Sequence, residues 1–137
     1  MAEVAVGGRR HALPAATVRR IVQGVLAAER RAADISVTFL GRDAMRRLNQ
    51  QYKQHDAPTD VIAFTLTSPD GRLVGDVYVC PWYAARTARR LGIGSRQEMI
   101  RILVHGVLHV LGYDHPHEDR TRSPMWRRQE RYVERFA

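Results

Sequence analysis

The chain has 137 residues, a net charge of +8 from 22 Lys and Arg against 14 Asp and Glu, and a single cysteine, Cys80. This length suits one domain with its own hydrophobic core, one cysteine excludes an internal disulfide, and no apolar run is long enough to span a membrane. We therefore expect a single domain over residues 1–137 that is soluble, cytoplasmic and without a membrane partner.

The first part of the chain alternates between segments typical of strands and segments typical of helices. A short strand is expected within Glu3 to Arg10, and apolar residues at helical spacing predict a helix from Pro14 to about Arg31. The segment from Ile35 to Leu40 is rich in β-branched residues and predicts a second strand, which Asp43 to Tyr52 follows as a second helix.

Two further strands are expected to form a hairpin. The segment from Val61 to Leu66 is apolar enough to be a central strand, and the turn residues Ser68 to Gly71 separate it from Leu73 to Cys80. Such a turn reverses the chain, so we expect the two strands to pair antiparallel. Cys80 ends this apolar stretch, and we expect a buried, unreactive thiol.

Three helices complete the predicted order. The third runs from Pro81 to about Gly92, and the last from about Ser123 to Phe136. Between them, Ser95 and Glu98 have the spacing of a capping box that begins a helix through Leu111. The expected fold is α/β (α+β), with a small mixed sheet of about four strands, one antiparallel hairpin and about five helices.

Three histidines have the spacing of ligands to one metal ion. His105 and His109 are four residues apart, so their rings lie on the same side of a helix. Gly112 favours the left-handed conformation that ends a helix, and the turn would bring His115 to the same ion. Two imidazoles buried side by side without a shared partner are unfavourable, which favours a metal site over histidines that only fill the core.

Neutral nitrogen ligands favour a catalytic zinc ion, one per chain, with an open fourth position. Nickel or another divalent ion stays an alternative. Cys80 is an available fourth ligand that its spacing does not favour. A zinc ion held in this way lowers the pKa of bound water to about 7 and polarises a phosphoryl or carbonyl oxygen, so hydrolysis is the expected reaction class.

The spacing H-x-x-x-H-x-x-G-x-x-H coincides with that of the metzincin peptidases, with one departure. Gly106 stands where those peptidases have the glutamate that serves as general base. Glu98 lies about 10 Å up the helix, where capping accounts for it. A metallopeptidase or other amide hydrolase is therefore the weaker hypothesis, and the general base is unidentified.

For each residue around His115, the sequence allows two roles. Asp114 fits either a partner that orients a ligand or a part of the turn. Tyr113 is interpreted as a packing residue, with base stacking as the alternative. His117 and Glu118 follow a proline and fit exposed or capping residues better than further ligands.

The segment from His105 to His115 resembles the signature of the YbeY family, the bacterial endoribonucleases that act as rRNA maturation factors. Two further blocks agree with this family. The first comprises Leu48 to Tyr52 followed by Ala57 to Phe64, and the second is Leu73 to Cys80. The resemblance covers about residues 35 to 115, and its three blocks follow one another at fitting distances.

This resemblance implies an α/β fold similar to zinc metallopeptidase catalytic domains, with one zinc ion bound by His105, His109 and His115. It also implies single-strand-specific cleavage of RNA in rRNA processing, in maturation of the 3′ end of 16S rRNA and in ribosome quality control. Ribosomal RNA and the small ribosomal subunit are the partners it implies, and no DNA is expected. The oligomeric state is unknown.

Family members have a basic residue, usually Arg, directly after the tyrosine that corresponds to Tyr52. Lys53 takes that place here. The resemblance implies a catalytic or substrate-binding role for Lys53, and a solvated lysine at a helix end is the alternative. Lysine keeps the charge but does not have the planar fork that binds phosphate through two hydrogen bonds.

The net charge of +8 favours a polyanionic partner, although surface solubility would produce the same excess. This charge is also compatible with a further, non-enzymatic hypothesis. In it the chain is a ribosome-assembly factor with a structural zinc ion and a basic surface that binds RNA.

Overall fold

The computed structural model describes residues 3–8, 13–114 and 123–137, and its elements follow the predicted order. The first half comprises β1 (Val4–Gly8), α1 (Ala15–Glu29), β2 (Ala33–Phe39) and α2 (Arg42–Lys53). The second half comprises β3 (Val61–Thr67), β4 (Leu73–Val79), α3 (Pro81–Leu91), α4 (Ser95–Val110) and α5 (Pro124–Phe136). The described residues thus form a four-stranded mixed sheet with five helices, which confirms the predicted α/β class.

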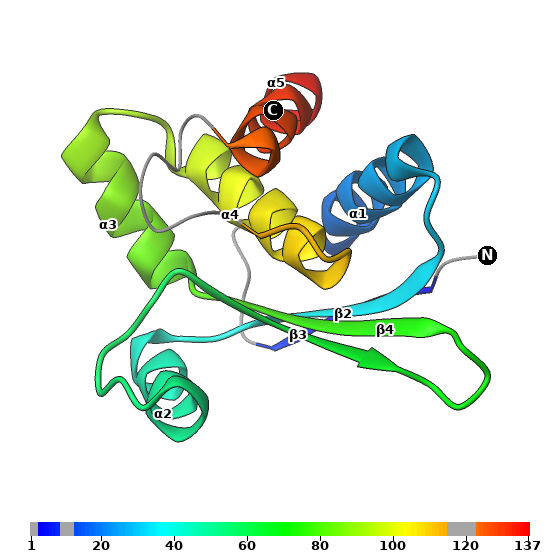
Figure 1. The fold of residues 1–137 in the computed structure, drawn as a ribbon. Coiled ribbons are helices and arrows are strands. Elements are labelled where there is room, and N and C mark those ends of the chain that lie inside the picture. The colour runs from blue at the N-terminus through cyan, green and yellow to red at the C-terminus, as the bar shows by residue number, and fades with distance from the viewer. Residues whose placement is uncertain (1–2, 9–12, 115–122) are drawn as a thin grey trace.

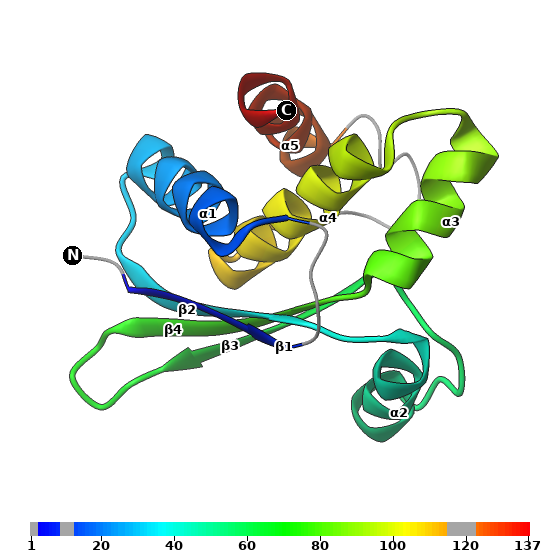
Figure 2. The same ribbon diagram turned by 180° about the vertical axis from the view of Figure 1, so that it is seen from behind.

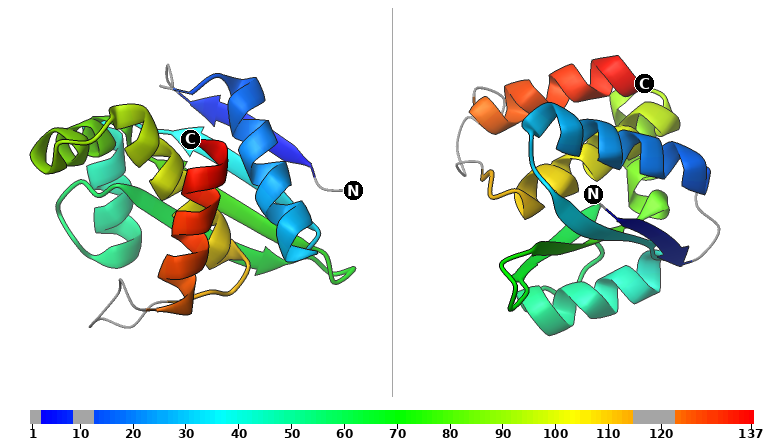
Figure 3. Two further views of the ribbon diagram at one scale, coloured as in Figure 1. Left: turned by 90° about the horizontal axis from the view of Figure 1, so that it is seen from above. Right: turned by 90° about the vertical axis from the view of Figure 1, so that its right-hand side faces the viewer.

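The helices are distributed unequally over the two faces of the sheet (Figure 1). Helices α1 and α4 lie on one face, and α5 packs on the outer side of α4, as the view from behind also shows (Figure 2). Helix α2 lies on the opposite face (Figure 3, right). Helix α4 contacts β3, β4, α1, α3 and α5, so it is the central helix that its apolar sequence predicts. No helix in the described ranges has the length and apolar character to cross a membrane.

The strand order is β1-β2-β4-β3, with parallel pairs except for the antiparallel hairpin of β3 and β4. The hairpin was predicted, but the prediction of a central strand at Val61 to Leu66 is wrong, because β3 lies at the edge of the sheet. Its apolar character has another cause. Val61 and Ala63 pack against the main core, and Ile62 is buried on the other side of the strand, against α2. Both faces of the first half of β3 are therefore covered.

Cys80 belongs to a small second core between the sheet and α2. This cluster includes Met45 and Ile62, and the Cys80 side chain is fully buried there. Burial raises the pKa of the Cys80 thiol. The thiol therefore stays protonated at neutral pH, in agreement with the prediction of an unreactive residue.

Two glycines allow α4 to lie directly on β4. A Cβ atom at Gly75 would lie 2.4 Å from Cγ1 of Val110, and one at Gly106 would lie 2.6 Å from Cγ1 of Val77. Neither distance is compatible with van der Waals contact between carbon atoms. Gly106 therefore has a packing role, and a glutamate at this position would collide with the sheet.

The ends of α4 agree with the sequence only in part. The predicted capping box is wrong, because Gly94 is the N-cap, Ser95 is the first helical residue and no side chain caps this end. Glu98 instead accepts a charge-assisted hydrogen bond from Arg101 Nη1 at 2.9 Å, an interaction stronger than a neutral cap. At the other end Gly112 has the predicted left-handed conformation, with a φ of 97°.

Glu29 ties α1 and α5 to the segment that follows α4. Its buried carboxylate accepts hydrogen bonds from Tyr113 Oη at 2.7 Å, from Arg128 Nη1 at 3.0 Å and from Tyr132 Oη. Burial opposes ionisation of Glu29, but these donors outweigh it and lower its pKa. Burial together with the hydrogen bond to Glu29 raises the pKa of Tyr132 to about 12. The interpretation of Tyr113 as a packing residue is confirmed.

We predict that Gly75→Ala lowers the free energy of unfolding by about 1–3 kcal/mol, because the new methyl group overlaps Val110 in a packed core. Urea denaturation measures the change. Gly7→Ala is the matched control, since a Cβ there has no atom within 4 Å, and we expect a change within about 0.5 kcal/mol. The double variant Gly75→Ala/Val110→Ala should lose less free energy of unfolding than the two single variants lose in sum. Simple additivity would show that the close approach is not the cause.

Candidate active site

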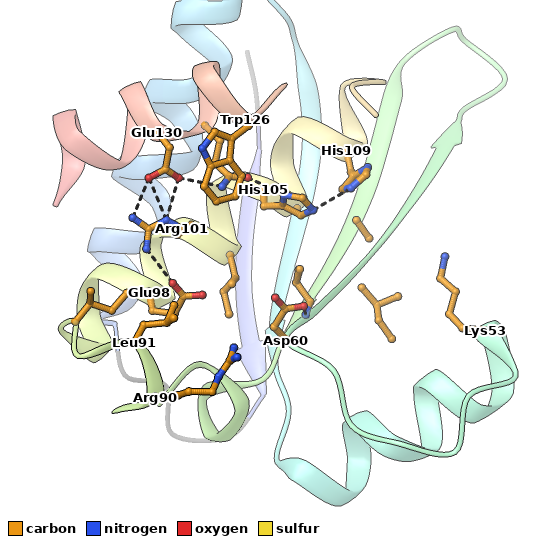
Figure 4. A pocket seen from close by; sticks show the side chains of 17 residues that line it. Lys53, Asp60, Arg90, Leu91, Glu98, Arg101, His105, His109, Trp126 and Glu130 are labelled. Carbon is orange, nitrogen blue, oxygen red and sulfur yellow. Dashed lines mark hydrogen bonds and ion pairs between the residues drawn. The ribbon is translucent and has the colours of Figure 1, made fainter. Parts of the chain in front are cut away.

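A cavity of about 730 Å³ opens beside α4 (Figure 4). Its wall is built from the end of α2, the start of β3, the end of α3, one side of α4 and the first turns of α5. Lys53, His105 and His109 all line it, so three of the residues singled out from the sequence share one cavity. The fourth, His115, lies outside the described residues, as do His117 and Glu118.

The two histidines of α4 point toward one another. The Nε2 atoms of His105 and His109 are 3.0 Å apart, and the ring centroids are 4.6 Å apart. Both side chains are half-buried and line the cavity. The convergence expected from their four-residue spacing is present in the structure.

Gln129 on α5 determines which nitrogen of His105 carries the proton. Its Nε2 donates to Glu130 Oε2 at 3.1 Å, and only the amide NH₂ group can donate to a carboxylate. This leaves Oε1 of Gln129 facing His105 Nδ1, at 2.7 Å. Nδ1 must therefore be the protonated nitrogen, and the lone pair of Nε2 points toward His109.

Arg101 holds Glu130 in place. Its Nε and Nη2 atoms each donate to one oxygen of Glu130 at 2.9 Å, while Nη1 donates to Glu98 at 2.9 Å. The hydrogen bonds that Arg101 donates to Glu130 and Glu98 raise the pKa of Arg101, whereas burial opposes this. One cation thus pairs with two carboxylates, and a continuous hydrogen-bonded series leads from Glu98 to His105.

The histidine pair fits a divalent ion that prefers nitrogen ligands. Two nitrogen ligands of a tetrahedral zinc ion lie about 3.3 Å apart, close to the observed 3.0 Å. The Gln129 contact also resembles the hydrogen bond that orients most metal-binding histidines. Within residues 3–8, 13–114 and 123–137 no group of three or more metal-binding side chains occurs. Cys80 does not line the cavity, which excludes it as the fourth ligand.

The rest of the described cavity wall combines apolar residues with Lys53, Arg90, Asp60 and Trp126. Lys53 lies on the far side from Arg101 and Glu130, Arg90 lies at the lower end, and Asp60 lies between Arg90 and Lys53 (Figure 4). Trp126 covers the side next to His105. Lys53 and Arg90 are both exposed, so their charges face solvent at the mouth of the cavity.

Several of these residues were not identified from the sequence. Arg101 carried a usable signal, because it precedes His105 by the same four residues that separate the two histidines. Gln129, Glu130 and Trp126 carried none. They reach the cavity only because α5 packs on α4, a tertiary contact without a local pattern.

Comparison with known proteins identifies the family. The family model described as Endoribonuclease YbeY matches residues 8–137. The chain belongs to the YbeY family. It is 38% identical over 100 residues to the Endoribonuclease YbeY of Thermotoga petrophila, covering 73% of the chain and 65% of that relative. It is also 38% identical over 129 residues to the Endoribonuclease YbeY of Chlorobium luteolum, covering 93% of the chain and 92% of the relative.

A solved structure supports the same fold. The solution structure of TM1509 from Thermotoga maritima matches with a TM-score of 0.71 and 29% sequence identity. The match covers 97% of this chain and 88% of the Thermotoga maritima chain. The YbeY arrangement of sheet and helices therefore extends over nearly the whole chain.

We predict that in Gln129→Leu the proton of the neutral His105 ring no longer stays on Nδ1. The reason is that the variant has no acceptor for that proton. Histidine tautomers can be read from long-range ¹H–¹⁵N NMR spectra of chelator-treated protein at pH 8. Gln97→Leu, an exposed glutamine of α4, is the matched control and should leave the wild-type tautomer unchanged. A wild-type spectrum with the proton of His105 on Nε2 would contradict the assignment.

Proposed function

We propose that this chain is a zinc-dependent, single-strand-specific endoribonuclease that acts in rRNA processing. Maturation of the 3′ end of 16S rRNA, ribosome quality control and a cytoplasmic location belong to the same proposal. The observation that carries it is the cavity that Lys53 lines together with the paired histidines His105 and His109, in a chain of the YbeY family. Its relatives from Thermotoga petrophila and Chlorobium luteolum are named endoribonucleases.

Several polar residues have a role in this proposal. His105, His109 and His115 would hold the zinc ion, which when bound supplies Lewis acidity at a phosphoryl oxygen and lowers the pKa of water to about 7. Gln129 keeps Nε2 of His105 unprotonated. Lys53 and Arg90 neutralise phosphates of the RNA at the cavity mouth.

The position of Gly106 argues against the peptidase alternative. The metzincin general base is a glutamate directly after the first histidine, and here that position faces Val77 of the sheet. Among the described residues, three carboxylates line the cavity. Glu98 and Glu130 are engaged by Arg101, and Asp60 Oδ1 accepts from the backbone N–H of Val61 at 2.8 Å. The cationic mouth favours a phosphodiester substrate over a peptide.

We predict that His109→Ala lowers cleavage of precursor small-subunit rRNA at least about 100-fold, since it removes a zinc ligand. Chelation should have the same effect on the wild type, and added zinc should restore its activity. Elemental analysis should find one zinc ion per wild-type chain and less in the variant. His55→Ala, an exposed histidine outside the cavity, is the control and should cleave normally.

The end groups of the RNA products distinguish two mechanisms of cleavage, and two results would contradict the proposal. A 2′,3′-cyclic phosphate end would show attack by the ribose 2′-hydroxyl, and its absence would show direct attack by water on phosphorus. Undiminished cleavage by folded, zinc-free His109→Ala would reject a metal-dependent nuclease. Wild-type protein that binds zinc and RNA without cutting would favour the ribosome-assembly hypothesis.

We predict that Lys53→Gln lowers kcat/KM for a single-stranded RNA about 10-fold, because it removes a positive charge that faces the substrate. Lys53→Arg should retain at least wild-type activity, since its guanidinium can hold a phosphate through two hydrogen bonds. The exposed position of Lys53 means that neither change should affect thermal stability. Full activity of Lys53→Gln would identify Lys53 as a solvated lysine.

A further inference from the structure

Helix α3 has an exposed face that is basic and contains one aromatic residue. Trp82, Arg86, Arg89 and Arg90 are all exposed, and their spacing places them within a sector of about 100° around the helix. We call these four residues the α3 basic face. The helix contains no acidic residue to balance them.

Trp82 holds two guanidinium groups close together. Cζ of Arg42, from the first turn of α2, lies 5.6 Å from the Trp82 ring centroid, and Cζ of Arg86 lies 5.5 Å from it. Both distances are typical of cation–π interactions, which favour arginine. The indole thus keeps two cations of different helices near each other, although their charges repel.

The three arginines of this face are available to a ligand, whereas Arg42 forms an ion pair with Asp43 at 3.1 Å. In the part of the chain that the structure describes, Arg86, Arg89 and Arg90 form no ion pair with a carboxylate. The dipole at the C-terminal end of a helix favours Arg89 and Arg90 there. It does not account for Arg86 in mid-helix or for an exposed tryptophan, so a binding role explains the set better.

The α3 basic face is continuous with the candidate active site. Arg90 lines the cavity (Figure 4), and Trp82 lies eight residues earlier, about 12 Å along the helix. A polymer that leaves the cavity past Arg90 therefore meets Arg86 and Arg89 next, and then the pair formed by Arg42 and Arg86.

We propose that the α3 basic face, together with Arg42, binds the phosphate backbone of single-stranded RNA from the edge of the cavity at Arg90 outward. This inference rests on the proposed function, because it takes the strand in the cavity to be RNA. Guanidinium groups bind phosphate oxygens through paired hydrogen bonds, and released counterions add to the affinity without regard to sequence. The α3 basic face determines how many nucleotides the protein binds. It does not determine which phosphodiester bond is cleaved.

The test compares strands of two lengths. Fluorescence anisotropy measures binding of labelled uridine 12-mers and 3-mers at several KCl concentrations, with every protein carrying His109→Ala so that the RNA stays intact. We expect Arg86→Gln/Arg89→Gln to bind the 12-mer about 10-fold more weakly and to lower the salt slope by about 0.7 for each phosphate that the variant no longer neutralises. Binding of the 3-mer, which has fewer phosphates to contact this surface, should weaken by a smaller factor.

Matched controls exist on the far side of the molecule. Arg20 and Arg135 are exposed, and their Cζ atoms lie 5.8 and 5.3 Å from the ring centroid of Phe136. Arg20→Gln/Arg135→Gln therefore removes the same charge as the α3 variant and also removes cation–π contacts. This variant should bind the 12-mer like its parent. Trp82→Leu is a second probe, and we expect it to weaken 12-mer binding because Arg42 and Arg86 lose their shared support.

The outcomes separate this inference from the proposed function. If the α3 and control variants bind the 12-mer equally, the inference is wrong, even where protein with an intact His109 cleaves RNA. If the α3 variants lose 12-mer affinity but protein with an intact His109 never cleaves RNA, the nuclease proposal fails and the RNA surface stands. Preferential loss of binding to an acidic peptide, with RNA binding intact, would overturn the inference in favour of a protein partner.

Discussion

The close approach of α4 to β4 determines where the residues of the cavity lie. Gly75 and Gly106 remove the two Cβ atoms that would separate the helix from the sheet, so the Gly106 side of α4 is fixed against Val77. The side of α4 that carries Arg101, His105 and His109 then faces the cavity beside the start of β3. Packed interiors resist small displacements, and this contact therefore orients the histidines rigidly.

Two carboxylate clusters, one of them only partly buried, complete this arrangement from the side of α5. Glu130 and Glu98 share Arg101 near the cavity, and Glu29 collects its three donors at the other end of α4. In both clusters every carboxylate is matched by hydrogen-bond donors, which is the condition for placing such groups in a protein interior. Helix α5 is thereby held at two separated points along α4.

Local patterns were sufficient to predict most of the fold. Helical spacing identified the five helices, turn residues identified the hairpin, and the four-residue spacing of His105 and His109 predicted their convergence. The error in placing β3 arose where tertiary contacts decide. A strand covered on both faces looks central even at an edge, as β3 does. The error at Glu98 has a local cause, because its partner Arg101 lies only three residues later in the same helix. Gln129 had no signal at all, since only the docking of α5 places it beside His105.

The Gln129 contact also makes the position of the proton on His105 depend on the docking of α5 against α4. When α5 leaves α4, His105 loses the acceptor that keeps its Nε2 lone pair available. Any ligand that needs this lone pair must then bind the docked form more tightly than the undocked form. Thermodynamic linkage requires the reverse as well, so such a ligand stabilises α5 by the same free energy. Occupancy of the cavity by such a ligand therefore lowers the population of molecules in which α5 is locally unfolded.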